Sequence, residues 1–185
     1  MAQRYPEITT RIWRFIEAQQ MFFVATAART GRVNVSPKGL DTLRILTPNR
    51  VAWLNLTGSG NETAAHILDV PRMTIMFCAF QGNPWIVRLF GTAAMVQPGE
   101  DGWDALAALF PPQRGSRQVF TLDIDLVLTS CGFGVPLYSY DGQRDVLDSW
   151  AAKKGEDGLL AYQRLKNTES IDGLPTGLVQ EGHHV

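Results

Sequence analysis

A strand pattern that begins near residue 118 constrains the fold of this chain more than any other feature. Apolar residues there alternate with polar ones such as Asp123 and Asp125. The apolar positions are Phe120, Leu122, Ile124, Leu126 and Leu128. Alternation with a period of two places one set of side chains on a buried sheet face and the other set in solvent. The pattern therefore predicts a long strand in a sheet that is covered on one face.

Several shorter strand-like segments precede this one and are separated by turn residues. They are residues 21–28, 33–36, 50–56, 73–80 and 85–96. The breaks between them contain Gly, Pro and Asn, which are typical of hairpin connections. Strands that follow one another through short turns favour an antiparallel sheet that closes into a barrel.

Helical patterns lie between and after the strands. The expected helices are residues 6–20, 61–68, 100–110, 145–154 and 159–166. The last two belong to a C-terminal extension of about residues 141–170, and the tail from Ile171 is expected to be extended or loose. We detect no internal repeat and no domain boundary. Residues 1–185 are thus expected to form one domain of mainly β structure with peripheral helices, an α+β fold.

Composition and charge exclude several classes of function. The net charge is −1 and no basic block is present, so nucleic-acid binding is not expected. No apolar run reaches the roughly 18 residues of a membrane span, and the first residues lack the order of a signal peptide. Cys78 and Cys131 are expected to be buried, reduced thiols of a cytoplasmic protein. The three histidines have no partners at metal-ligand spacing, so no metal site is expected.

The segment 57–63 is the most informative candidate site. A strand ends there, two glycines allow close approach of a ligand, and a helix begins. The first N–H groups of a helix have no intrahelical acceptor and suit a phosphate. Short polar side chains accompany them at Thr57, Ser59, Asn61 and Thr63. The alternative is a capping box, in which Ser59 and Glu62 satisfy each other's backbone N–H groups, and Glu62 would also repel a phosphate.

A second candidate lies at the end of the preceding strand, in Ser36-Pro37-Lys38-Gly39. Proline removes a backbone donor, which indicates a strand end or a sheet edge. Lys38 there would supply a positive charge that offsets the negative charge of Glu62. The alternative is that Lys38 is a solvated loop residue, which is the commoner environment of a lysine.

Together these segments resemble the pyridoxamine 5′-phosphate oxidase-like family of FMN-binding split barrels. The resemblance rests on the order and spacing of residues 33–39, 51–63, 69–77 and 86–91. It covers roughly Ile8 to Pro136. Residues 130–136 and the helical tail after them are more similar to a branch distinct from the true oxidases.

The resemblance implies a six-stranded antiparallel split β-barrel and a homodimer with two FMN sites, each built from both chains. The cofactor-binding residues it implies are Val33, Asn34, Val35, Ser36, Lys38, Leu56 and Thr57. The family's phosphate-binding pair, Arg-Lys in the oxidases, falls here on Glu62 and Thr63. The replacement charge and donors are expected from the helix N–H groups with Ser59, Asn61, Thr63 and Lys38, and from Arg114 or Arg117, including across the dimer.

The resemblance also implies an FMN-dependent oxidoreductase that acts on a small organic molecule, with NAD(P)H as a candidate electron donor. No catalytic residue is assigned. Pyridoxamine 5′-phosphate oxidase activity itself is not expected, because the substrate-binding set of the oxidases is matched only at Lys38. Two alternatives stay open: a flavin-binding or sensing protein without turnover, and the same barrel with F420 or haem. Cys131 is either a reactive thiol near the flavin or a packing residue.

Overall fold

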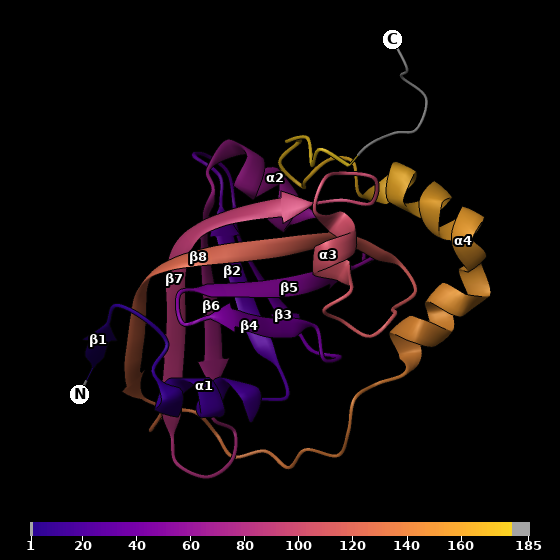
Figure 1. The fold of residues 1–185 in the computed structure, drawn as a ribbon. Coiled ribbons are helices and arrows are strands. Elements are labelled where there is room, and N and C mark those ends of the chain that lie inside the picture. The colour runs from indigo at the N-terminus through magenta and orange to yellow at the C-terminus, as the bar shows by residue number, and fades with distance from the viewer. Residues whose placement is uncertain (1, 179–185) are drawn as a thin grey trace.

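An eight-stranded antiparallel sheet forms the body of the protein in the computed structural model, which describes residues 2–178 (Figure 1). Its strands are β1 (Gln3–Tyr5), β2 (Phe22–Ala27), β3 (Val33–Lys38), β4 (Leu43–Thr47), β5 (Arg50–Leu56), β6 (Arg72–Cys78), β7 (Trp85–Val96) and β8 (Ser116–Cys131). They lie in the order β3-β2-β6-β7-β8-β5-β4, and β1 pairs with β8. The predicted class, mainly β with peripheral helices, is confirmed. The predicted number of six strands is wrong, because β1 and β4 were not expected.

The sheet curves around an apolar core but is not closed, and β3 and β4 are its two edges. Aromatic side chains fill the centre of the core: Trp53 stacks on Phe120 with ring centroids 4.7 Å apart, and Phe22 meets Trp53 edge-on at 6.4 Å. Phe77 and Leu122 are also fully buried. Burial of such side chains stabilises each by about 1.5–3 kcal/mol, so the core holds the curvature of the sheet.

A β-bulge changes the buried face of β8 part-way along the strand. The register against β7 shifts at Gly91, which leaves one extra residue, Asp125, on β8. Beyond the bulge, Leu126 and Leu128 turn to the outer face and Val127 is buried instead. The prediction that these two leucines share the buried face is therefore wrong. A Cβ atom at Gly91 would lie 1.9 Å from a carbonyl oxygen of β8, so the bulge requires glycine there.

Four helices lie outside the sheet: α1 (Thr10–Glu17), α2 (Glu62–Asp69), α3 (Trp103–Ala107) and α4 (Val146–Lys166). Thr9 caps α1 by accepting a hydrogen bond from the Ile12 N–H at 3.4 Å. The two helices predicted within the C-terminal extension are one element interrupted at Gly155, whose φ is 68°. α1 and α2 lie at opposite ends of the sheet, and α4 runs along its side (Figure 1). Within residues 2–178, no helix combines the length and apolarity needed to cross a membrane.

Residues 39–42 carry the chain from one edge of the sheet to the other. They join β3 to β4, and Leu40 and Asp41 adopt the left-handed region with φ of 61° and 56°. The extended segment before α4 supports this connection. In it, Gln143 accepts a hydrogen bond from the Leu40 N–H at 3.3 Å and donates one to the Gln20 carbonyl at 3.0 Å. The two sheet edges are thus tied together at one end of the gap between them.

Candidate functional site

A cavity of about 270 Å³ lies in the gap of the sheet, between β3, the end of β5 and the start of α2. Eight of the residues predicted to bind a cofactor line it: Asn34, Ser36, Lys38, Leu56, Ser59, Asn61, Thr63 and Arg117. The cavity exists because alternate residues of β3 point inward at this edge, while β5 ends opposite them. The two sequence segments singled out as candidates therefore meet around one space.

Three of the predicted residues do not line this cavity. Val33 and Val35 alternate with the inward residues of β3 and are 70% and 59% exposed on the other face. Thr57 is buried behind the loop. Its hydroxyl donates a hydrogen bond to the Gly115 carbonyl at 2.7 Å and accepts one from Gln163 at 2.7 Å. Thr57 thus holds the loop from behind.

Arg117 enters the cavity wall from β8 and is only 4% exposed. Its guanidinium donates to the Asn167 side-chain oxygen at 2.6 Å and to the Gly60 carbonyl at 2.8 Å. With its amide oxygen turned toward the guanidinium, Asn55 accepts from Nε at 3.1 Å. These partners are all neutral, and no carboxylate pairs with Arg117 among residues 2–178. Burial lowers the pKa of Arg117 to about 10, so the group remains charged at neutral pH.

Lys38 contributes a second positive charge from β3. Its ammonium lies 5.0 Å from the centroid of the Trp53 ring. Burial, and secondarily the charge of Arg117, lower the pKa of Lys38 to about 8. The alternative of a fully solvated lysine is therefore wrong, because the side chain is half-buried at the cavity.

Unpaired donors complete the cavity. Among the described residues, no acceptor is found for the backbone N–H groups of Glu62 and Thr63, which open α2. The Ser36 hydroxyl is buried and also has no partner there. Unpaired donors beside two cations make the cavity suited to an anion.

Within residues 2–178, Glu62 is the one acidic residue of the cavity lining. The alternative of a capping box between Ser59 and Glu62 is wrong, because the N-cap of α2 is Asn61 and its side chain makes no capping hydrogen bond. Instead, both carboxylate oxygens of Glu62 accept a hydrogen bond from the Ile171 N–H at 3.1 Å. Glu62 is thus bound to the C-terminal segment, a contact across 109 residues of sequence that no local motif indicates.

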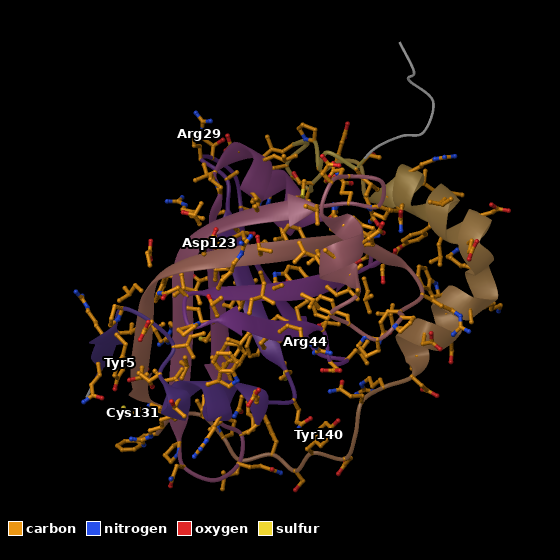
Figure 2. The ribbon with its side chains drawn as sticks, viewed as in Figure 1. Tyr5, Arg29, Arg44, Asp123, Cys131 and Tyr140 are labelled. Carbon is orange, nitrogen blue, oxygen red and sulfur yellow. The ribbon has the colours of Figure 1, made fainter. Side chains whose placement is uncertain are left out.

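The other polar residues considered from the sequence lie elsewhere. Arg114 forms an exposed ion pair with Asp148 at 2.9 Å. His66 is buried, with Nδ1 3.0 Å from the Thr26 hydroxyl. Cys78 is buried as expected, and burial raises the pKa of its thiol. Cys131 is exposed, which contradicts the expectation, and it lies at the opposite end of the molecule from Arg29 beside α2 (Figure 2).

Sequence reasoning missed two residues of the site. Asn55 lines the cavity from β5, and Asn167 supports Arg117 from beyond α4. A buried asparagine is uncommon, and the polar residue in the apolar run of β5 was a usable signal for Asn55. Asn167 follows a charged helix, where an asparagine is unremarkable, so the sequence held no such signal for it. Among residues 2–178, no cluster of acidic, histidine and cysteine side chains is placed to hold a metal ion.

A family model and a curated relative both connect the chain to pyridoxamine 5′-phosphate oxidases. Residues 8–131 match the family model described as pyridoxamine 5′-phosphate oxidase. The chain is 34% identical, over 92% of its length and 76% of the relative's, to the pyridoxamine 5′-phosphate oxidase family protein ustO of Aspergillus flavus.

Two solved structures show the same fold. A variant of HupZ from Group A Streptococcus superimposes with a TM-score of 0.55 at 21% identity, over 66% of this chain and 99% of that one. HutZ, the haem storage protein of Vibrio cholerae, gives 0.50 at 17% identity, over 69% and 98%. At these identities, the likeness establishes the fold alone.

Proposed function

This chain belongs to the pyridoxamine 5′-phosphate oxidase family, and from that premise we propose that it binds FMN, with the phosphate in the cavity between β3 and α2. One observation carries the proposal. Arg117, which is almost fully buried, and the half-buried Lys38 line the same cavity, and within residues 2–178 every hydrogen-bond partner of Arg117 is neutral. Burying an uncompensated charge is costly, so two such charges in one cavity favour an anionic ligand.

The charges and donors of the cavity match the needs of a phosphate monoester. Such a group carries about two negative charges at neutral pH. Arg117 and Lys38 would supply two positive charges, against which the lining sets the one carboxylate of Glu62. The N–H groups of Glu62 and Thr63 with the Ser36 hydroxyl would donate hydrogen bonds to the phosphate oxygens. These residues take the place of the Arg-Lys pair that the oxidases carry at the start of α2. A bound flavin would supply hydride or electron transfer, which makes an FMN-dependent oxidoreductase acting on a small molecule the activity we propose.

Haem is less well supported as the ligand of this cavity. A haem protein needs an axial ligand, most often histidine, cysteine, methionine or tyrosine. None of these residue types lines the cavity within the described part of the chain. A phosphate-bearing flavin or deazaflavin needs no such ligand.

We further propose that the protein is a homodimer that pairs through the outer face of its sheet. Apolar residues of four strands point outward there: Val33 and Val35 of β3, Ala25 of β2, Phe90 of β7 and Leu126 of β8, with Thr74 of β6 between β2 and β7. Contiguous exposed apolar patches on a sheet favour association. Because β3 lines the cavity with its other face, a second copy docked here would lie against the same edge strand that bounds the proposed site. Sedimentation of the purified protein tests this, and a monomer at micromolar concentration would refute it.

The test of the main proposal is the identity of the bound ligand. Purified protein should absorb as a flavoprotein, and mass spectrometry of the ligand released by heat should identify FMN. Detection of F420 would replace FMN by F420 as the assigned ligand. A Soret band with no flavin would overturn the proposal. Flavin reduction by NAD(P)H without another enzyme supports oxidoreductase activity. A flavin inert to NAD(P)H and to small-molecule oxidants supports a binding or sensing role instead.

A further inference from the structure

The segment that follows α4 closes the back of the candidate cavity. It runs from Asn167 to Thr176 and lies over the start of α2 (Figure 1). One hydrogen bond joins it to Glu62, and an ion pair joins its Asp172 to Arg32 at the β2–β3 turn. This segment lies outside residues 8–131, the part that matches the family model. The residues that line the cavity are therefore held from behind by a part of the chain that the family model does not cover.

Asn167 is the central residue of this closure and has no exposed surface. Its side-chain oxygen accepts from Arg117 at 2.6 Å, and its side-chain nitrogen donates to the Gly58 carbonyl at 3.0 Å. Its backbone carbonyl accepts from Thr176 at 2.6 Å and from Asn61 at 3.4 Å. The side-chain oxygen thus holds Arg117 of β8 and the side-chain nitrogen holds the loop at Gly58, so the contacts require one acceptor and one donor on a short side chain.

The neutrality of Asn167 matters as much as its geometry. A carboxylate at this position would still accept from Arg117 but would cancel the guanidinium charge. An apolar residue would leave one guanidinium N–H and the Gly58 carbonyl without partners. An amide keeps Arg117 in place and leaves its charge available to the cavity.

Resting on the proposed function, we propose that Asn167 is a positioning residue: it holds Arg117 and the loop at Gly58–Gly60 so that the anionic end of the cofactor meets an uncompensated guanidinium. This makes the C-terminal extension part of the determinant that selects phosphorylated over unphosphorylated flavin. The selectivity between FMN and riboflavin measures the effect directly, because the two differ only in the phosphate.

The experiment compares the wild type with Asn167→Ala and Asn167→Asp after bound flavin has been removed. Fluorescence titration gives the dissociation constants of FMN and riboflavin for each protein. For Asn167→Ala, we expect FMN binding to weaken about tenfold and riboflavin binding to change by less than about twofold. For Asn167→Asp, we expect a larger loss for FMN. If Asn167 had only a structural role, Asn167→Asp would lose less FMN affinity than Asn167→Ala, because aspartate keeps the shape of the side chain and its hydrogen bond to Arg117.

Gln163→Leu is the matched control. Gln163 is also a buried amide of the C-terminal extension and donates to Thr57, but it does not contact Arg117. We expect this variant to melt at a lower temperature and to keep the preference for FMN. If Asn167→Ala does not fold, the near-isosteric Asn167→Asp alone decides the test.

The outcomes separate this inference from the proposed function. If the wild type does not prefer FMN to riboflavin, the proposed function fails and the inference fails with it. If the wild type prefers FMN and the Asn167 variants keep that preference, or lose both ligands equally, the inference is overturned and the proposed function stands.

Discussion

Two cavities flank the crossing at residues 39–42, and they differ in charge more than in size. The larger, about 380 Å³, lies between α1 and β4. Its lining holds one cation and two carboxylates: Arg44 donates to both carboxylate oxygens of Asp41 at 2.7 and 3.0 Å, and Glu17 accepts from the neutral indole of Trp13 at 2.8 Å. The smaller cavity, between β3 and α2, holds two cations, Arg117 and Lys38, and one carboxylate, Glu62, and within residues 2–178 none of the three forms an ion pair. Charge balance, rather than volume, therefore marks the smaller cavity as the binding site.

Removing the buried guanidinium of Arg117 should weaken FMN binding more than any other change. We expect Arg117→Met to weaken FMN binding about 100-fold, because a charge-assisted contact is lost and the Asn167 oxygen is left unpaired. Riboflavin binding should change by less than about threefold. Arg114→Met, which removes an exposed arginine of the same strand region, is the control and should bind FMN as the wild type does. If Arg117→Met and Arg114→Met bind FMN equally well, the charge of Arg117 does not mark the smaller cavity as the binding site.

Changes at Lys38 and Thr63, across the cavity from Arg117, should have the second-largest effect on FMN binding. Lys38→Ala combined with Thr63→Ala should weaken FMN retention at least tenfold, as the loss of about 1.5 kcal/mol of phosphate contacts requires. Flavin content after dialysis measures the effect. Unchanged content would place the phosphate away from β3.

The pH dependence of binding should sharpen the role of Lys38. Its pKa in the free protein is about 8, and a bound phosphate would raise that pKa. Binding of FMN should therefore be strongest below about pH 8 and weaken as the pH rises through 8 toward 9. Titrations across this range should show the decline for the wild type and a flat profile for Lys38→Met. A decline that persists in Lys38→Met would assign the dependence to another group.

The smallest effect is expected in the larger cavity. Arg44→Ala removes a cation that Asp41 already balances, so the FMN dissociation constant should change by less than about twofold. A loss comparable to that of Arg117→Met would show that the larger cavity takes part in binding.

Much of the sheet could be predicted from the sequence. The bounds of β5 and β7 agree with the expected segments, because their apolar residues are bounded by clear turn residues. β4 was missed because its residues are mostly half-buried and lack a clean alternation. The bulge on β8 was missed because an inserted residue leaves the apolar composition unchanged and alters only which face each residue occupies.

The site was predictable where it is local and not where it depends on distant contacts. Lys38 and the turn before α2 carry their signal in neighbouring residues, and the structure brings them to one cavity. The bond of Glu62 to Ile171 and that of Arg117 to Asn167 join residues far apart in the sequence. Because such contacts depend on where the segment after α4 lies against β8 and α2, no local pattern could indicate them.

The short connection at residues 39–42 has a mechanical consequence. It fastens the two free margins of the sheet to each other at one end, and Gln143 braces it from outside. The covalent connection between β3 and β4 therefore limits how far the gap can widen at this end. At the far end, the β2–β3 turn meets the C-terminal segment through the ion pair of Arg32 and Asp172. An ion pair with an exposed arginine contributes little stability, so the two ends of the gap are held with unequal strength.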